Sequence, residues 1–420
     1  MIHESTMSST SQFLQMGDAG VRWSELPSEI WSAVGKRLNN YIDVLRFRSV
    51  CRSWRSSLPP FQETSPPPRL RFPSSTTAES FSVHVFLSQS TVYRLSPLHP
   101  QPSPNDSSSC SSTRPNGRLV KLEKLELPKM RLLHPLSKRQ IGYNLKSVPD
   151  EQKEFNLLDT RIDKLATSYS LKFTDDICVP GIAKVVVAIP NSEECTIIAV
   201  YEGGKLGFAR LGDEKWNLID EQNFHYDDVI VHNRQYYAVD KWGTIFWIDS
   251  SMRLVQFSPP LIGLGHRKHL VECGGELLVI DRFVDQERQF RHPIHHIDRD
   301  PVAISKAIDF KAYKLDQEWG RWVEVKNLGN LSIILGNDCS FSVEASKFDG
   351  CIQNCIYFSD SNDDEFSVRS SIRVFDLEGG RIGKILAYPG IIDIFSRPPI
   401  WLSKSLPPLK DINFQHRHEN

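Results

Sequence analysis

The chain has 420 residues, enough for two or three domains, and its 50 Lys and Arg against 51 Asp and Glu give a net charge of −1. That balance excludes a uniformly basic nucleic-acid coat protein and a long acidic tail. Hydrophobic residues make up 40% of the chain, which is typical of a folded soluble protein. No apolar run approaches the roughly 20 residues of a membrane helix, and residues 1–20 lack the pattern of a secretory signal.

The helical signals lie in the first 60 residues. Residues 1–21 are rich in Ser, Thr and Gln without a hydrophobic period, and we expect a disordered leader. Residues 22–60 show helical periodicity, and Pro27 suits the start of a helix. Clustered prolines in 61–78 cannot donate the hydrogen bonds of a helix, so this segment is predicted to be a linker.

From residue 79 the hydrophobic period changes from 3.6 to 2, which predicts a mainly β domain over 79–400. A Pro- and Ser-rich insert at 99–117 is expected to be a disordered loop, and residues 401–420 are expected to form a solvated C-terminal tail. The predicted strands include 82–88, 195–201, 235–240, 244–249 and 371–377. The chain is therefore expected to be an α+β multidomain protein.

The β-rich part contains a repeat. The segments 197–209 and 236–248 align at an offset of 39 residues, which pairs Gly204 with Gly243, and a third copy begins at 275–283. Each copy reads as two strands joined by a turn. A period of about 40 residues is that of a four-stranded propeller blade. We therefore predict a β-propeller of about six or seven blades, with a pair of β-sandwiches as the alternative.

Residues 22–60 predict three short helices with little core of their own. The apolar residues at helical spacing are, in chain order, Leu26, Ile30, Val34 and Leu38, then Ile42, Leu45 and Val50, then Trp54 and Leu58. Seven Lys and Arg against three Asp and Glu give this module a net charge of +4. So small a unit is marginally stable unless a partner covers its apolar surface. It therefore predicts an acidic partner with a hydrophobic groove.

The pattern WSELPSEIWSAVGKRL, followed by VLRFRSVCRSWRSSL, closely resembles an F-box, whose recurring elements are LPxE, a helix and VCRxWR. The resemblance implies that the module binds the Skp-type adaptor of a cullin–RING ubiquitin ligase and that the rest of the chain recruits a target. Trp54 is expected in the core of the module. The adaptor-facing positions, each with the alternative role of holding the helices together, would be Leu26, Pro27, Ile30, Val34, Leu45 and Val50.

Three later segments, 236–249, 321–343 and 354–360, resemble the C-terminal domain of a large plant family of F-box proteins. That domain is thought to be propeller-like, and the resemblance covers most of residues 160–380. It implies a plant protein of the SKIP-type F-box family, and it identifies no target.

No coherent catalytic, metal or cofactor site is predicted. Cys351 and Cys355 lack the second pair of a zinc site, and Cys355 precedes an apolar run that predicts burial. Cys51 lies inside the F-box pattern, where packing is the expected role. The acidic pairs at 227–228 and 363–364 would suit a propeller enzyme, but at strand edges such pairs are more typical of solvated turns.

The segment 281–300 is longer than a hairpin requires and mixes cationic and aromatic side chains. This composition suits a target-binding loop, and a solvated loop is the alternative. The residues concerned are Arg288, Phe290, Arg291, His292, His295 and His296.

These observations predict a non-catalytic substrate receptor of a ubiquitin ligase, located in the nucleus or cytoplasm, where irregularly spaced cysteines remain reduced. No membrane or nucleic-acid partner is expected. Two alternatives stay open. A nucleic-acid-binding transcriptional regulator would use the +4 helical module, although the rest of the chain then carries −5. A propeller enzyme would need polar residues that converge in a central pocket.

Overall fold

The structure is a computed structural model. It describes residues 27–35, 37–38, 41–59, 69–73, 82–98, 117–125, 130–136, 140, 160–188, 195–210, 213, 216–285, 306–348, 350–359, 372–384 and 395. The chain divides into two units, Met1–Glu63 and Thr64–Asn420, which are described separately. Within the described ranges, no helix is both long and apolar enough to span a membrane.

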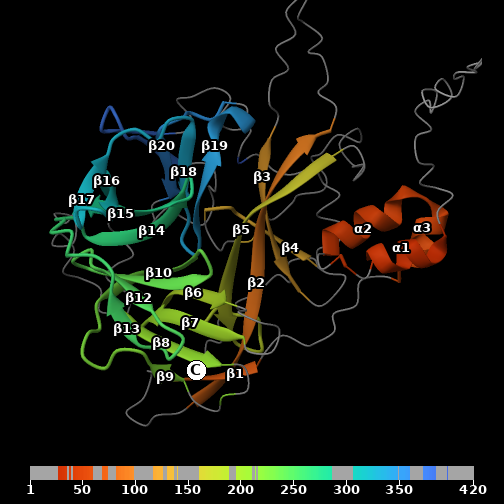
Figure 1. The fold of residues 1–420 in the computed structure, drawn as a ribbon, viewed down its shortest axis with the longest axis horizontal. Coiled ribbons are helices and arrows are strands. Elements are labelled where there is room, and N and C mark those ends of the chain that lie inside the picture. Colours follow the sequence, from red (N-terminus) through yellow and green to blue (C-terminus); the bar gives the residue numbers. More distant parts are fainter. Residues whose placement is uncertain are drawn as a thin grey trace, which may run out of the picture. The chain divides into compact units, whose positions relative to one another are not determined.

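The first unit contains the three predicted helices (Figure 1): α1 (Ser28–Gly35), α2 (Tyr41–Val50) and α3 (Arg52–Ser57). Cys51 has an extended backbone and caps α3, because its sulfur accepts a hydrogen bond from the Trp54 N–H at 3.5 Å. Cys51 therefore has a structural contact inside the module, as a helix cap rather than through the packing that was expected.

The second unit begins with a nine-stranded sheet of order β4-β3-β2-β5-β6-β7-β8-β9, with β1 paired to β2. Its strands are β1 (Arg69–Pro73), β2 (Ser82–Pro97), β3 (Arg118–Lys124), β4 (Met130–Leu133), β5 (Thr160–Lys172), β6 (Ile182–Ala188), β7 (Thr196–Tyr201), β8 (Lys205–Arg210) and β9 (Asn217–Leu218). A single residue pair, Tyr169 with Val185, joins β5 to β6. The sheet is therefore two four-stranded groups joined at one point, with β1 added at the side.

Three further sheets follow in chain order. The first contains β10 (Tyr226–His232), β11 (Gln235–Asp240), β12 (Ile245–Ile248) and β13 (Leu254–Gln256). The second contains β14 (Arg267–Cys273), β15 (Glu276–Val284), β16 (Ala307–Asp316) and β17 (Arg321–Val325). The last contains β18 (Leu331–Leu335), β19 (Ser340–Glu344), β20 (Cys355–Ser359), β21 (Ile372–Asp376) and β22 (Arg381–Lys384), and β18 pairs with β20 in parallel.

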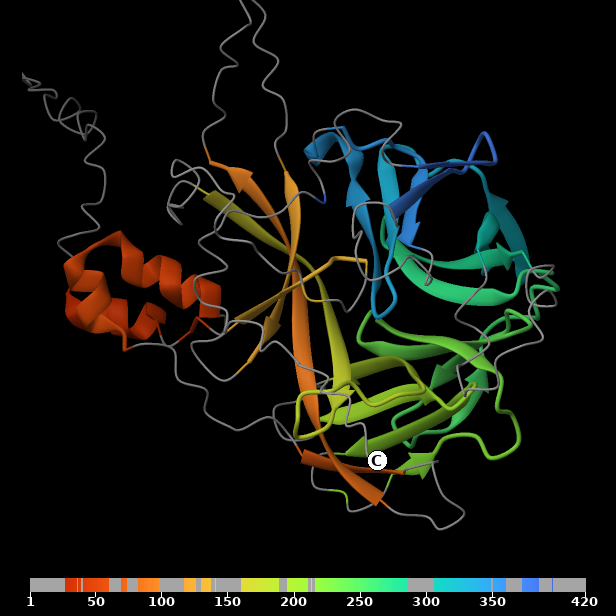
Figure 2. The same cartoon turned by 180° about the vertical axis from the view of Figure 1, so that it is seen from behind.

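The innermost strands of these groups form a closed ring. Strands β5, β6, β10, β14 and β19 each lie beside the next, and β19 lies beside β5 (Figures 1 and 2). At this closure, the Asn337 N–H donates to the Leu136 carbonyl oxygen at 3.0 Å. The strands therefore form a propeller-like ring, as predicted.

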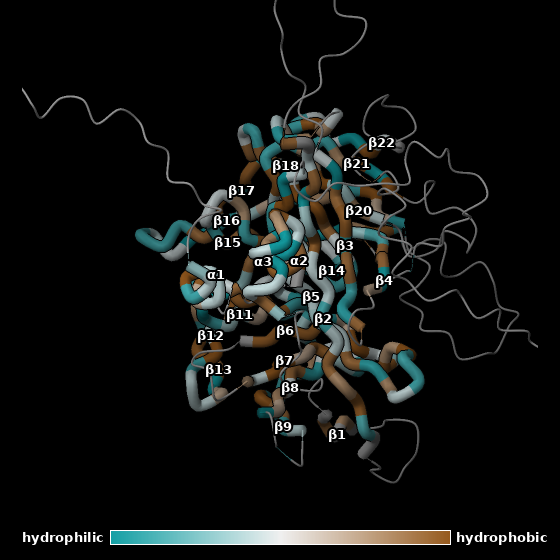
Figure 3. Tube along the Cα trace, turned by 90° about the vertical axis from the view of Figure 1, so that its right-hand side faces the viewer, coloured by the Kyte–Doolittle hydropathy of each residue, from teal (hydrophilic) through white to brown (hydrophobic). Residues whose placement is uncertain are grey.

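Each group buries both of its faces, which explains the apolar sequence of its strands. In β7, Ile197 and Ala199 face one hydrophobic cluster, whereas Ile198 and Val200 face another. Because successive side chains of a strand point to opposite faces, residues 197–200 of β7 are apolar at every position. Brown, hydrophobic segments accordingly lie within the strands in Figure 3, and teal segments mark many of the turns.

The repeat has a structural reason. Gly204 and Gly243 both have positive φ, and each lies in the turn after the second strand of its group. A Cβ on Gly204 would lie 2.5 Å from the Phe224 carbonyl oxygen, and a Cβ on Gly243 would lie 2.5 Å from the Leu261 Cβ. Both turns therefore need glycine, because each packs closely against the connection to the next group.

Two predictions about organisation need correction. The described residues form five groups of four or five strands, whereas the 40-residue period applied to residues 79–400 predicted six or seven blades. The predicted linker 61–78 contains β1, since Leu70 and Phe72 alternate into a hydrophobic core and override the neighbouring prolines. The leader 1–21, the tail 401–420 and the insert 99–117, apart from Gly117, lie outside the described residues.

Candidate functional site

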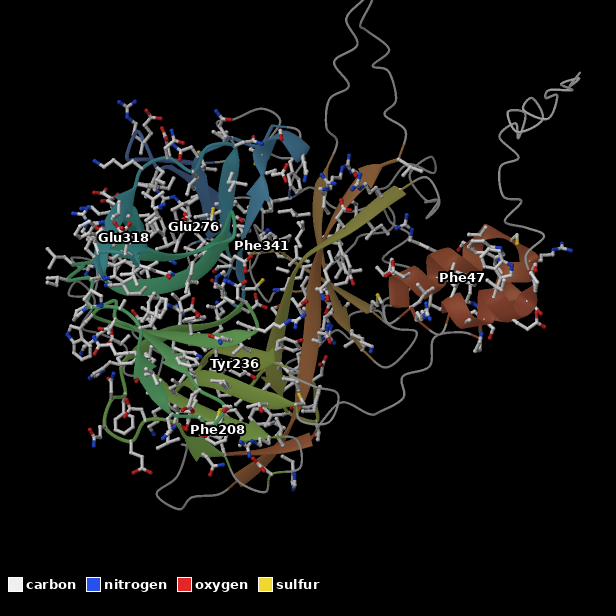
Figure 4. The ribbon with its side chains drawn as sticks, viewed as in Figure 1. Phe47, Phe208, Tyr236, Glu276, Glu318 and Phe341 are labelled. Carbon is white, nitrogen blue, oxygen red and sulfur yellow. The ribbon has the colours of Figure 1, made fainter. Side chains whose placement is uncertain are left out.

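The helical module is held together by three aromatic rings. Trp31 of α1 lies 3.9 Å from Trp54 of α3 between ring centroids, and Phe47 of α2 lies 4.6 Å from Trp54. Leu58 completes the core against Gly35, where a Cβ would lie 2.6 Å from the Leu58 Cδ1. Figure 4 labels Phe47 within this module. Sequence reasoning placed Trp54 correctly in the core but missed Trp31 and Gly35, which lie four residues apart on one face of α1.

The side chains predicted to contact the adaptor lie mainly outside that core. Ile30, Val34 and Val50 are 45%, 41% and 45% exposed. Pro27 is also exposed, Leu45 is half-buried, and Leu26 lies outside the described residues. Ile30 and Val34 are four residues apart and share a face of α1. The module therefore presents apolar groups that its own core does not use, and their adaptor role stays a prediction.

Two of the basic side chains of the module are engaged internally. Arg48 Nη1 donates to the carbonyl oxygens of Arg55, at 3.0 Å, and of Leu58. Arg55 Nε donates to the Arg48 carbonyl oxygen at 3.0 Å. These bonds connect α3 to α2. Two of the arginines that give the module its positive charge therefore stabilise the packing of its helices.

A cavity of about 380 Å³ lies within the ring of inner strands. It is lined from β5, β6, β10, β14 and β19, for example by Tyr169, Val186 and Phe341, the last labelled in Figure 4. Three charged side chains also reach it, and each has a partner of opposite charge. Lys184 pairs with Asp228 at 2.9 Å, Asp338 with Lys121 at 2.6 Å, and Glu272 with His232 at 3.0 Å when that histidine is protonated.

The interior of the propeller contains buried ion pairs that the sequence did not reveal. Lys121 and Asp338 are 217 residues apart, and their side chains are 0% and 4% exposed. Burial alone would lower the pKa of Lys121, but the Asp338 carboxylate more than offsets this and raises it. Three further lysines pair with carboxylates in the interior: Lys172 with Glu123 at 2.6 Å, Lys184 with Asp228 at 2.9 Å and Lys268 with Asp281 at 2.9 Å.

The acidic pair at 227–228 bridges two neighbouring groups of strands. Asp227 Oδ2 accepts a hydrogen bond from the Lys268 N–H at 2.8 Å, and Asp228 Oδ2 accepts one from the Leu270 N–H at 2.9 Å. The expectation of solvated turn residues is wrong here. These two N–H groups of β14 bond to carboxylates of β10 instead of to the backbone of a neighbouring strand, which satisfies their need for an acceptor. Burial raises the pKa of Asp227 to about 6.

The remaining candidate residues are the cysteines, the possible metal ligands and the predicted target-binding loop. Cys355 is buried in a hydrophobic cluster, as predicted. The part of the chain that the structure describes contains no group of three or more His, Cys, Asp and Glu arranged to hold a metal ion. The proposed target-binding residues Arg288, Phe290, Arg291, His292, His295 and His296, and the pair 363–364, lie outside the described residues.

Comparison with known proteins identifies the propeller. The family model described as KIB1-4 beta-propeller matches residues 83–376, which run from β2 to the end of β21. The chain belongs to this family. Its five groups of strands are thus those of a KIB1-4 propeller, and the predicted fold class of a helical F-box followed by a propeller is confirmed.

The relatives of this KIB1-4 propeller chain are plant F-box proteins, as the sequence patterns predicted. Putative F-box protein At1g65770 of Arabidopsis thaliana is 30% identical over 367 residues, covering 85% of this chain and 92% of its own. Putative F-box protein At5g60060 is 32% identical, covering 77% and 84%, and F-box protein SKIP23 is 27% identical, covering 91% and 96%, both from the same plant. An oligogalacturonate lyase of Vibrio parahaemolyticus covers 48% of this chain and 53% of its own at 10% identity and a TM-score of 0.26, which supports no argument.

Proposed function

We propose that this F-box protein is the substrate receptor of a Skp–cullin–F-box ubiquitin ligase. In this role the helical module binds the Skp-type adaptor, and the propeller holds a target protein for ubiquitination and degradation. The gain in rate comes from proximity between target lysines and the ubiquitin carrier, so the receptor needs no acid–base chemistry of its own. Its working location is then the nucleus or cytoplasm.

One observation carries the proposal. The helical module has a complete aromatic core, yet Ile30, Val34 and Val50 remain exposed. Covering the area that these side chains still expose would favour binding by about 25 cal/mol for each Å² of apolar surface removed from water. This is the surface that an adaptor with a hydrophobic groove would bind.

The cysteines support a non-catalytic role. A ligase that carries ubiquitin itself needs a thiolate at neutral pH, which requires a lowered thiol pKa. Burial instead raises the pKa of Cys339 to about 11 and of Cys355 to about 12. The pKa of Cys195, Cys273 and Cys351 is raised by burial as well.

The two rival functions have less support. A DNA reader would use free arginines, but Arg48 and Arg55 are bonded to backbone carbonyl groups of the module. A propeller enzyme would use carboxylates that face a substrate, but Asp228 and Asp338 are engaged by Lys184 and Lys121. The target-binding role of the segment that contains Arg288 to His296 is part of the proposal.

The test is the affinity of the full chain for a purified Skp-type adaptor. Ile30→Asp combined with Val34→Asp should weaken binding at least tenfold, because two charges would enter an apolar interface. Ser53→Asp combined with Ser56→Asp adds the same charge at exposed positions of α3 and should change affinity little. An adaptor affinity that is equal in both double variants would refute the proposed role of α1.

A salt series separates the alternatives. Binding to the adaptor through apolar contacts should change little between low and high salt, whereas binding of a DNA duplex through phosphate contacts would fall steeply. Tight, salt-sensitive DNA binding without adaptor binding would favour the regulator instead.

A further inference from the structure

The connection from β13 to β14, residues 257–266, exposes two large aliphatic side chains. Ile262 and Leu264 are each 86% exposed, the most exposed of the large hydrophobic residues that the structure describes. Trp242, in the neighbouring turn between β11 and β12, is 48% exposed. The hydrogen bond from the Leu261 N–H to the Trp242 carbonyl oxygen places the two connections side by side, and contiguous exposed apolar surface marks interaction sites. Residues 261–265 together with Trp242 are called the apolar loop site below.

A buried ion pair forms hydrogen bonds with the backbone of this site. Asp281 and Lys268 are 2.9 Å apart, and both side chains are 0% exposed. Asp281 Oδ2 accepts from the Gly265 N–H at 3.1 Å, and Lys268 Nζ donates to the Gly265 carbonyl oxygen at 2.7 Å. A Cβ on Gly263 or Gly265 would lie within 2.4 Å of an Asp281 carboxylate oxygen. Glycine at both positions therefore lets the loop lie directly on the ion pair.

Two more hydrogen bonds fix the loop at its start. The Leu261 N–H donates to the Trp242 carbonyl oxygen at 3.0 Å, and Trp322 Nε1 donates to the Pro259 carbonyl oxygen at 2.9 Å. Residues 259 and 260 are both proline, which restricts the backbone further. Because the loop is already ordered, little of its conformational entropy would be lost when a partner binds Ile262 and Leu264.

Ile262 also has an unfavourable backbone conformation. Its φ of +55° lies in the left-handed region, which a β-branched residue adopts only when its surroundings enforce it. The strain places the Ile262 side chain in solvent, where it contributes nothing to the core. A strained backbone that exposes an apolar group is a cost to the fold, and such costs are concentrated at functional sites.

The charges around the site favour an acidic partner. Lys241 Nζ lies 4.5 Å from the centroid of the Trp242 ring, and the His225 ring lies 5.7 Å from it. His266 ends the connection, and Arg267 begins β14, where its guanidinium group also interacts with the Asp227 carboxylate. The nearby acids are engaged within the fold, since Asp240 accepts from the Trp242 and Thr244 N–H groups, and Asp227 and Asp281 contact residue 268.

We propose that the apolar loop site binds the target protein through a segment in which one or two large apolar side chains are flanked by Asp or Glu. Ile262, Leu264 and Trp242 would contact the apolar side chains, and Lys241 and Arg267 the acidic ones. The inference rests on the proposed function as a substrate receptor and specifies the chemistry of the target.

The probe is an array of 15-residue peptides graded in apolar and acidic content, incubated with the purified full chain. Binding should increase with both properties, and it should fall at least tenfold for Ile262→Ser combined with Leu264→Ser. Trp319→Ser removes another side chain that is 70% exposed, in the turn between β16 and β17. Because strands alternate in direction, that turn lies at the opposite end of its sheet, and this variant should bind like the parent.

Two further variants test the built geometry. Ile262→Gly removes the strain, so its melting temperature should equal or exceed that of the parent while peptide binding weakens. Gly265→Ala keeps the apolar side chains but displaces the loop from Asp281, and binding should weaken here too.

Equal binding by the parent and the Ile262→Ser, Leu264→Ser variant, or equal binding of peptides with acidic and basic flanks, would overturn the proposal. Concentration-dependent dimerisation of the parent that this variant abolishes would also overturn it, because the occupant would then be a second copy of the chain.

Adaptor affinity, measured on the same proteins, separates this inference from the proposed function. All loop variants should bind the Skp-type adaptor as the parent does. If the parent binds the adaptor but no acidic apolar peptide, only the loop inference fails. If the parent does not bind the adaptor, the receptor function itself fails.

Discussion

The helical module and the propeller are stabilised in different ways. The module depends on one small core, in which Trp31, Phe47 and Trp54 contact one another and Leu58 closes the side. The propeller has several hydrophobic clusters, and buried ion pairs and carboxylate bridges connect its groups of strands. A unit of about 40 residues cannot bury all of its apolar side chains, so some remain for a partner. A closed ring can bury its apolar side chains. Where neighbouring strands do not pair with each other, however, other groups must form hydrogen bonds with their backbone N–H and C=O groups.

The largest effect is expected at the closure of the ring. Asp338→Ala leaves the Lys121 ammonium buried without its carboxylate, which should lower the free energy of unfolding of the propeller by about 3 to 5 kcal/mol. Denaturant unfolding of the full chain measures this. Lys121→Met combined with Asp338→Leu removes both charges and should restore most of the loss. Equal loss in both variants would show that packing, rather than charge, dominates at this position.

The module should respond separately from the propeller. Phe47→Ala removes a buried ring and should cost about 3 kcal/mol, which is enough to unfold so small a unit. Hydrogen exchange should then increase throughout α1, α2 and α3, while the strands of the propeller remain protected. Loss of protection in β10 or β14 would mean that the two units are energetically coupled.

Asp227 should make the stability of the propeller depend on pH. An unfolded Asp227 loses its proton near the ordinary value of 3.8, whereas the folded one holds it to about pH 6. The folded state therefore binds more protons between pH 4 and 6, and its stability falls as the pH rises through this window. Asp227→Asn lacks this titration, so its stability relative to the parent should rise by about 2 kcal/mol between pH 4 and 7. Glu221→Gln, which removes an exposed carboxylate shortly before β10, serves as the control substitution.

The smallest effect is expected for an ion pair on the surface. Lys347 and Glu344 are 2.6 Å apart, but both side chains are about half exposed. Lys347→Ala should change the free energy of unfolding by less than about 0.5 kcal/mol, because solvent screens the pair. A loss comparable to that of Asp338→Ala would contradict the distinction between buried and exposed pairs.

Local patterns predicted most of the fold. The helical spacing of residues 22–60 and the alternation in segments such as 235–240 gave elements that the structure contains. The 39-residue offset between Gly204 and Gly243 marked equivalent turns, because both must approach the next connection closely. These features depend on neighbours along the chain, so they are visible in the sequence.

Features formed by distant residues were not predictable in this way. The burial of Asp227 and Asp228 depends on β14, which lies about 40 residues further on, and a pair of acidic residues alone resembles a solvated turn. The sequence predicts a linker where β1 lies, because the pairing of this strand with β2 is not visible among the prolines. The exposure of Ile262 and Leu264 depends on the ion pair beneath them.

The sequence by itself therefore determined the F-box pattern, the two-part organisation and the repeat of the propeller, because each is written in the spacing of residues close together in the chain. Only the tertiary structure decided which apolar side chains are core and which are surface, how the ring closes, and which charges are paired. Those properties depend on residues that are brought together from as far as 217 positions apart.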